Sequence, residues 1–119
     1  MIGDGGFHFS SPDSVYAVAQ NYQLPILTMV LDNGGWQAVK SAVQRVYPTG
    51  VAAETDQFQS RLTSGRQGER RDFSAIGRAF GAHGEHVTEP DELAAAIDRC
   101  LAALDGGKAA VLHVQVTPL

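Results

Sequence analysis

The sequence is poor in cysteine, in long apolar runs and in positive charge, and each shortage excludes a class of protein. A single cysteine among 119 residues rules out an internal disulfide and is typical of the reducing cytoplasm. No apolar run approaches the roughly 20 residues that a membrane-spanning helix requires. A net charge of -4 offers no general attraction for nucleic acid or an acidic membrane. We therefore expect a cytoplasmic protein with neither a nucleic-acid partner nor a membrane partner.

Several catalytic signatures are also missing from the sequence. It contains no Gly-x-Ser-x-Gly nucleophile elbow, no Walker loop and no zinc-ligand cluster. The start of the chain lacks the basic and apolar regions of a secretory signal. An apolar fraction of 44% and a charged fraction of 18% are those of a soluble globular domain. We expect residues 1–119 to form one domain.

The first half of the chain predicts a helix, a strand and a second helix. Ser11-Pro12-Asp13 is typical of a helix start, with a hydroxyl N-cap and proline at the first helical position. An apolar stripe at helical spacing then follows, made of Val15, Val18, Ala19 and Tyr22. The short apolar run 26–31 predicts a strand buried on both faces, and residues 37–46 predict the second helix.

The second half begins with a long loop at about 49–71 that carries at most one short helical turn. Its arginines leave two interpretations open, a solvated stretch or a mobile lid over a site. Asp72 then caps a helix, 85–88 form a short strand and 109–116 form the last strand. Between these strands Pro90 opens a helix whose apolar face is made of Leu93, Ala96, Ile97, Cys100, Leu101 and Leu104. This alternation predicts an α/β fold, a parallel sheet with helices on both faces, in which ligands bind beyond the carboxyl ends of the strands.

Two polar, glycine-rich clusters would meet at that edge of the sheet. The first is Gly3-Asp4-Gly5-Gly6, and the second is Asp32-Asn33-Gly34-Gly35-Trp36. Carboxylate and amide oxygens are ligands for a hard cation such as Mg²⁺. Glycines let backbone N–H groups approach a phosphate without a Cβ in the way. The two clusters together predict a magnesium-diphosphate site.

Gly3-Asp4-Gly5, followed at this distance by Asp32-Asn33, resembles the thiamine-diphosphate-binding signature. Further landmarks extend the resemblance over nearly the whole chain: Leu24-Pro25, Trp36-Gln37-Ala38-Val39, Tyr47-Pro48, Asp72-Phe73, Ala79-Phe80-Gly81-Ala82, Glu89-Pro90-Asp91-Glu92-Leu93 and Thr117-Pro118. Their order is similar to that of the C-terminal, diphosphate-binding domain of acetolactate synthase-like and benzoylformate decarboxylase-like enzymes.

The resemblance implies the cofactors thiamine diphosphate and Mg²⁺. It implies metal ligation by the Asp4 carboxylate, the Asn33 side chain and the Gly35 carbonyl. The implied cofactor-binding residues are Gly3, Asp4, Gly5, Gly6, Asn33, Gly34, Gly35 and Trp36. The family often has asparagine where Asp32 stands, and we expect this carboxylate to point away from the diphosphate because the two charges repel. A parent enzyme of this kind is a homo-oligomeric lyase or transferase that decarboxylates or carboligates 2-keto acids.

The resemblance also implies that catalytic parts lie outside this chain. In the family an activating glutamate comes from another domain and an apolar wedge precedes the Gly-Asp-Gly turn, and neither is found here. Only Met1 and Ile2 stand for the strand that should lead to Asp4, so we expect a piece of a larger polypeptide, or a natural short product. Val39 stands where some decarboxylases place an acid, which disfavours a carboxylate-assisted pyruvate decarboxylase mechanism. We assign no catalytic residue and expect the isolated chain to be inactive.

Two other functions stay open at this point. One is a non-catalytic fragment of the same fold that serves only binding or assembly. The other, a Rossmann-like nucleotide module, is disfavoured because the first cluster is not Gly-x-Gly-x-x-Gly. His8 is expected to pack as a polar side chain or to reach a substrate, and Cys100 to be a core thiol. His83, His86 and His113 share no face that suggests a metal site, and His113 is expected to be structural.

Overall fold

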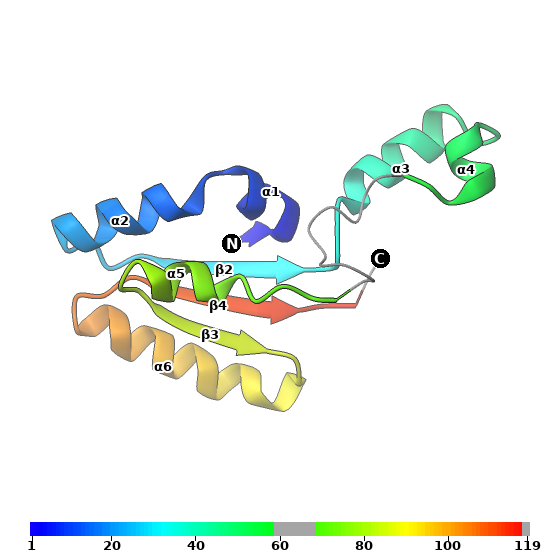
Figure 1. Ribbon diagram of the computed structural model, residues 1–119. Helices are drawn as coiled ribbons and strands as arrows, with labels where there is room; N and C mark the ends of the chain where they lie inside the picture. The colour runs from blue at the N-terminus through cyan, green and yellow to red at the C-terminus, as the bar shows by residue number, and fades with distance from the viewer. Residues whose placement is uncertain (59–68, 118–119) are drawn as a thin grey trace.

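The computed structural model describes residues 1–58 and 69–117. Within these residues, strands in the order β1-β2-β4-β3 form one sheet, and every neighbouring pair is parallel (Figure 1). The strands are β1 (Ile2–Gly3), β2 (Leu27–Asp32), β3 (His83–Val87) and β4 (Ala110–Gln115). The predicted parallel α/β sheet is therefore confirmed.

Helices cover both faces of the sheet, as predicted. One face carries α1 (Asp4–Phe9), α2 (Pro12–Tyr22) and α5 (Ser74–Ala79), and the other carries α6 (Leu93–Asp105), which follows the short 3₁₀ helix η2 (Pro90–Glu92) (Figure 1). Each face has its own buried cluster. The first includes Phe7, Tyr16, Val30, Phe73 and Val111, and the second includes Val87, Ala96, Cys100, Leu112 and Val114.

The alternation of side chains along β2 and β4 decides which residues meet which helices. On β4, Ala110, Leu112 and Val114 belong to the cluster under α6, and Val111 belongs to the cluster on the opposite face. The same alternation turns His113 and Asp32 toward the face of α1 and α5, where both are buried. A polar pair therefore lies at one end of an apolar core.

The start of α2 and the face that it buries differ from the prediction. The helix begins at Pro12, but Ser11 has φ 51° and makes no side-chain capping hydrogen bond, because a capping residue needs an extended backbone. Val15 and Val18 are exposed, whereas Tyr16 and Ala19 are buried. Of the predicted stripe, Ala19 is confirmed as buried, whereas the expectation is wrong for Val15, Val18 and Tyr22. Tyr16 is buried instead, because it packs against Phe7 at a ring-centroid distance of 6.4 Å.

The helix after Asp72 begins as predicted, whereas one residue of α6 does not follow the prediction. The Asp72 carboxylate accepts a hydrogen bond from the Ser74 N–H at 3.0 Å and so caps α5. Along α6, Ala96 and Cys100 are buried, which confirms Cys100 as a core thiol. Leu101, expected on the same apolar face, is 45% exposed, because it lies next to the buried stripe rather than on it.

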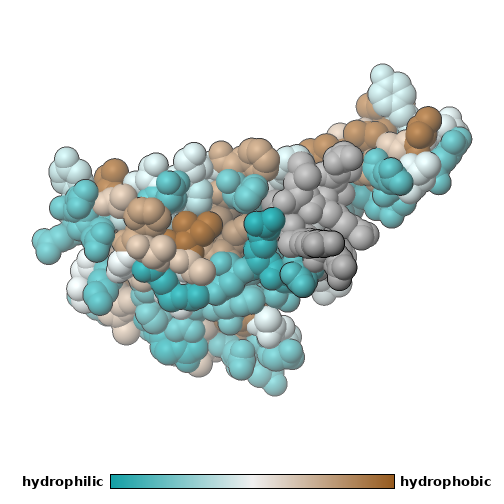
Figure 2. Space-filling model, in the orientation of Figure 1, coloured by the Kyte–Doolittle hydropathy of each residue, from teal (hydrophilic) through white to brown (hydrophobic). Residues whose placement is uncertain are grey.

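An arm of two helices extends away from the sheet. The predicted helix at 37–46 is α3 (Gln37–Val46), and the short turn expected in the long loop is α4 (Val51–Thr55) (Figure 1). Neither helix has a buried residue. Figure 2 shows hydrophobic surface on this arm, where Val39, Val46 and Val51 are exposed. Residues 59–68 of the expected solvated stretch or lid lie outside the described residues, so that question stays a prediction.

Across the described ranges, no helix is both long enough and apolar enough to cross a membrane.

Candidate functional site at the carboxyl edge of the sheet

The two glycine-rich clusters follow neighbouring parallel strands. Gly3 on β1 pairs in register with Leu31 on β2, so Asp4 and Asp32 occupy equivalent places at the carboxyl edge of the sheet. The first cluster is not an open turn, because Asp4 begins α1 and Gly5 and Gly6 lie in its first turn. The sheet therefore brings the clusters to one edge, as the sequence predicts.

The Asp32 carboxylate is the centre of a buried hydrogen-bonded network. It accepts the Gly34 N–H at 2.8 Å and the Arg70 Nη1 at 2.8 Å, and its other oxygen lies 3.1 Å from His113 Nε2. Asp4, itself buried, also lies beside the Asp32 side chain and is among the groups that lower the pKa of Asp32. The Asp32 carboxylate is therefore turned inward, beneath its own turn.

The charge of Asp32 is set by these partners. Burial alone would raise the pKa of the Asp32 carboxyl, but hydrogen bonds from His113 and the Gly34 amide, with the positive charge of Arg70, lower that pKa to about 2. Asp32 is thus ionised at neutral pH. Arg70 lies 38 positions along the chain, so sequence reasoning, which placed it in a loop, had no signal for this ion pair.

Asn33 faces a different space from Asp32. It lines an open cleft of about 490 Å³ whose other walls are Met1, Ile2, Gly3, Leu31, Val116 and Thr117. The Asn33 Oδ1 accepts the Gly35 N–H at 3.3 Å, and an amide oxygen keeps a second lone pair for another partner. The structure therefore places Gly3 and Asn33, one from each cluster, on a single cleft at the carboxyl edge.

Trp36 lies against the first cluster. Its indole ring occupies the space that a Cβ on Gly5 would need, so only glycine fits at this position without moving the ring. The Trp36 ring also packs against Phe9 at a centroid distance of 4.8 Å, and Trp36 is partly exposed. On the second cluster, Gly34 has φ 88°, a left-handed conformation that favours glycine. The guanidinium of Arg70 packs directly on Gly34, with Cζ 3.1 Å from where a Cβ would stand.

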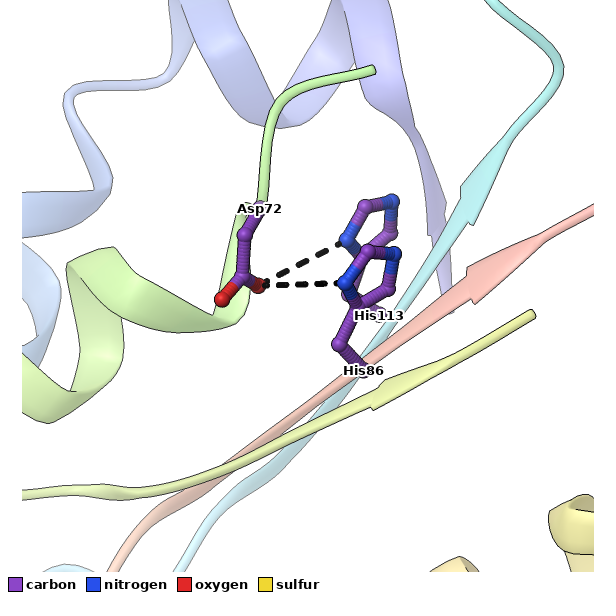
Figure 3. A group of neighbouring side chains, drawn as sticks. All are labelled: Asp72, His86 and His113. Carbon is purple, nitrogen blue, oxygen red and sulfur yellow. Dashed lines mark ion pairs between the residues drawn. The ribbon is translucent and has the colours of Figure 1, made fainter.

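Three further side chains, Asp72, His86 and His113, gather on the α5 side of the sheet (Figure 3). An Asp72 oxygen lies 4.0 Å from His86 Nδ1 and 3.8 Å from His113 Nδ1. The imidazoles are stacked at 4.2 Å with planes 5° apart, so their Nδ1 lone pairs run side by side and do not converge on one point. Asp72 is moreover bonded to Ser74 and to Arg78, the latter at 2.6 Å. The group is explained by these contacts without a metal ion.

Sequence reasoning missed this histidine pair for a specific reason. His86 and His113 are directly opposed in the β3–β4 register, and no pattern in a single sequence shows which residues of two parallel strands are opposed. The buried His113 is structural, as expected: its Nδ1 accepts the Phe73 N–H at 3.3 Å and its Nε2 contacts Asp32. His8 is exposed at the surface, and its ring packs edge-on against Phe9 at 5.1 Å.

Comparison with known proteins identifies the family. The family model described as "Thiamine pyrophosphate enzyme, C-terminal TPP binding domain" matches residues 1–114. The chain is 33% identical over 118 residues to the acetolactate synthase large subunit IlvG of Mycobacterium tuberculosis and to a probable acetolactate synthase of Mycobacterium bovis. It is 31% identical over 121 residues to the acetolactate synthase isozyme 2 large subunit of Escherichia coli.

These alignments cover 99–100% of this chain but only 18–19% of the relatives' length. The chain thus corresponds to one part of those proteins, and the matched part carries both glycine-rich clusters and all four described strands. It belongs to the thiamine pyrophosphate enzymes, as a C-terminal TPP-binding domain similar to that of acetolactate synthase large subunits.

Proposed function

We propose that this chain binds the diphosphate of thiamine diphosphate through Mg²⁺ at the carboxyl edge of its sheet. The observation that carries the proposal is the shared cleft, because Gly3 and Asn33 come from opposite ends of the diphosphate-binding signature and line one space. The cleft is lined by β1, by the last part of β2 and by the residues that follow β2 and β4, next to the edge where parallel α/β sheets bind ligands. The family membership supports the same cofactor.

The residues present fit the cofactor and the metal. Asn33, which lines the cleft, and the Gly35 carbonyl would supply protein oxygens to Mg²⁺, which prefers such hard ligands. Asp4 is buried beside Asp32 and does not line the cleft, so its carboxylate would have to turn away from Asp32 to join them. Gly3, with nothing within 4 Å of where a Cβ would stand, would leave room for the phosphates, whereas Gly5 and Gly6 face Trp36 and Ile2 and would contribute through their backbone. Gly34 would act by lacking a Cβ rather than as a donor, because its N–H already binds Asp32. Trp36 would form one wall of the site.

The reaction of the parent enzyme is a 2-keto acid decarboxylation or carboligation of the acetolactate synthase type. When bound, the thiazolium ring of the cofactor supplies the electron sink for carbon–carbon bond chemistry. The part proposed for this chain is to bind and orient the diphosphate end. We assign the activating carboxylate to another domain, and propose that the parent is a cytoplasmic homo-oligomer that takes small-molecule keto acids.

A second candidate is a non-catalytic fragment that binds the cofactor weakly or serves assembly. The specific observation in its favour is that the chain spans only 18–19% of its relatives. Under both candidates, the chain on its own is expected to release no carbon dioxide from pyruvate or benzoylformate, because cofactor anchoring without transition-state stabilisation does not raise the chemical rate. They differ in cofactor affinity.

Calorimetric titration of the chain with thiamine diphosphate, with Mg²⁺ or with EDTA, tests the proposal. We expect binding only with Mg²⁺, and an Asn33→Ala variant that binds at least about tenfold more weakly, because a charge-associated ligand contact is lost. Asn21→Ala, an exposed asparagine on α2, is the matched control and should bind as the parent does. Equal binding in EDTA, or an unaffected Asn33→Ala variant, would contradict the assigned site.

A further inference from the structure

Arg70 contacts the Asp32–Gly35 turn, although the diphosphate-binding signature does not include it. Its Nη1 donates to the Asp32 carboxylate at 2.8 Å and to the Asp32 carbonyl oxygen at 3.2 Å. The same guanidinium packs on Gly34, at the tip of the turn. Arg70 is therefore held against both the charged side chain and the backbone of the Asp32–Gly35 turn.

The negative charge of Asp32 would repel a diphosphate bound at this turn, and Arg70 lies where its positive charge can offset that of Asp32. The Asp32 carboxylate is almost fully buried, with 3% of its side chain exposed, so water screens it poorly. A diphosphate at Gly34 and Gly35 would lie one turn of backbone away from this negative charge, and two like charges at that separation repel strongly inside a protein. A guanidinium paired with the carboxylate cancels the repulsion. Its own side chain is 28% exposed, so the cation lies at the boundary of the site.

We propose that Arg70 is a positioning residue that compensates the charge of Asp32 and so allows the Asp32–Gly35 turn to accept an anionic diphosphate. This inference rests on the proposed function. In this arrangement Asp32 fixes the turn through the Gly34 N–H, His113 fixes the second Asp32 oxygen, and Arg70 removes the electrostatic cost of having a carboxylate there. Arg70 acts through Asp32 rather than by contact with the phosphates.

A double-mutant cycle on the 119-residue chain separates this role from a direct phosphate contact. The variants are Arg70→Met, Asp32→Asn and the pair, each titrated with thiamine diphosphate in Mg²⁺. Arg70→Met keeps the length of the side chain without its charge, and Asp32→Asn keeps an acceptor for the Gly34 N–H. We expect Arg70→Met to weaken binding about tenfold when Asp32 is present, but less than about twofold in the Asp32→Asn background.

Two further measurements test whether the effect is one of charge. Arg70→Lys keeps the cation and should recover most of the affinity, and the loss in Arg70→Met should shrink as ionic strength rises. Arg71→Met, an exposed neighbour in the chain, is the matched control and should bind as the parent does. Thermal unfolding of each variant checks that it is folded. If Asp32→Asn does not fold, Asp32→Ser, which also offers an acceptor oxygen to the Gly34 N–H, replaces it in the double-mutant cycle.

The outcomes that overturn the inference are distinct from one another. An equal loss in both Asp32 backgrounds would assign Arg70 to direct phosphate contact. Identical affinities for Arg70→Met and Arg71→Met would remove Arg70 from the site. If the unsubstituted chain itself does not bind the cofactor in Mg²⁺, the proposed function fails first, and the inference fails with it.

Discussion

His86 and His113 lie face to face on neighbouring strands, with ring centroids 4.2 Å apart and planes inclined by only 5°. His113 is fully buried, whereas the His86 side chain is 28% exposed. The stack is bounded by Asp72 and Arg78 on the α5 side and by Asp32 on β2, and His86 Nε2 contacts Gln115 at 3.0 Å. A charge on one ring therefore has another imidazole, two carboxylates and a guanidinium near it.

This stack predicts that stability falls as pH drops below neutrality. Burial lowers the pKa of His86, and the neighbouring His113 lowers it further, while Asp72 and Asp32 raise it in part. Because the folded state holds its proton less tightly than the unfolded state, the unfolded chain binds more protons once pH falls to the ordinary histidine pKa of about 6.5, and stability is lost from there downward. The slope stays below about 1.4 kcal/mol per pH unit, the limit for one full proton.

Urea unfolding between pH 7.5 and pH 5.5 measures this slope. His86→Gln, which removes the titrating ring but keeps a polar side chain beside Gln115, should flatten it. His8→Gln, at an exposed position on α1, is the matched control and should leave the slope as it is. An unchanged slope in His86→Gln would mean that another group carries the pH dependence.

Gly77→Ala should destabilise the fold by about 1–3 kcal/mol, the usual cost of an extra carbon in a packed core. Gly77 is buried in α5, and a Cβ there would overlap Cγ2 of Val111 on the central strand. The helix would have to move off the sheet. Gly106→Ala is the control, because a Cβ there meets only ordinary contacts, the nearest at 3.4 Å. Equal unfolding midpoints for the two variants in urea would contradict the packing described for α5.

Gly5→Ala should displace the indole of Trp36 and shift its fluorescence. Trp36 is the only tryptophan in the sequence, so the emission reports the surroundings of this ring alone. The added methyl group would occupy the ring position, and the ring would move toward solvent, which shifts the emission to longer wavelength. Gly3→Ala, where nothing lies within 4 Å of the new Cβ, is the control for emission without cofactor. An unshifted spectrum in Gly5→Ala would mean that the indole does not rest on Gly5.

Asp72→Ala should cost about 0.5–2 kcal/mol at pH 7, the usual range for the loss of a helix cap. Asp72 accepts hydrogen bonds from the Ser74 amide and hydroxyl and pairs with Arg78. Burial would raise the Asp72 pKa, but Ser74 and Arg78 lower it to about 2, so this contribution is complete above pH 4 and is lost as pH falls toward 2. Thermal unfolding at pH 7 and pH 2.5 measures both effects. Asp98→Ala, an exposed position on α6, should change stability by less than about 0.5 kcal/mol at pH 7.

The sequence predicts most of the elements because their signals are local. The apolar run of β2, the proline at the start of α2 and the Asp72 cap each act within a few residues, and each is found where expected. The meeting of the two glycine clusters is also predictable, because parallel strands share their carboxyl edge. What could not be predicted depends on partners far along the chain. Tyr16 rather than Val15 is buried in the core, and Arg70 pairs with Asp32. Both outcomes depend on which distant segments pack together, and a single sequence does not show this.

The arm formed by α3 and α4 has a consequence for how the molecule unfolds. Because neither helix has a buried residue, their backbone hydrogen bonds are protected, within the part of the chain that the structure describes, mainly by the helices themselves and by surface pairs such as Lys40–Asp56 at 2.8 Å. Local opening of such a segment has a free energy well below that of the whole domain. Amide protons of α3 should therefore exchange with deuterium long before those of β4, whose residues from Ala110 to Val114 are all buried. We therefore expect α3 and α4 to open at a lower free energy than the sheet, with the Asp32–Gly35 turn as the junction between the two parts.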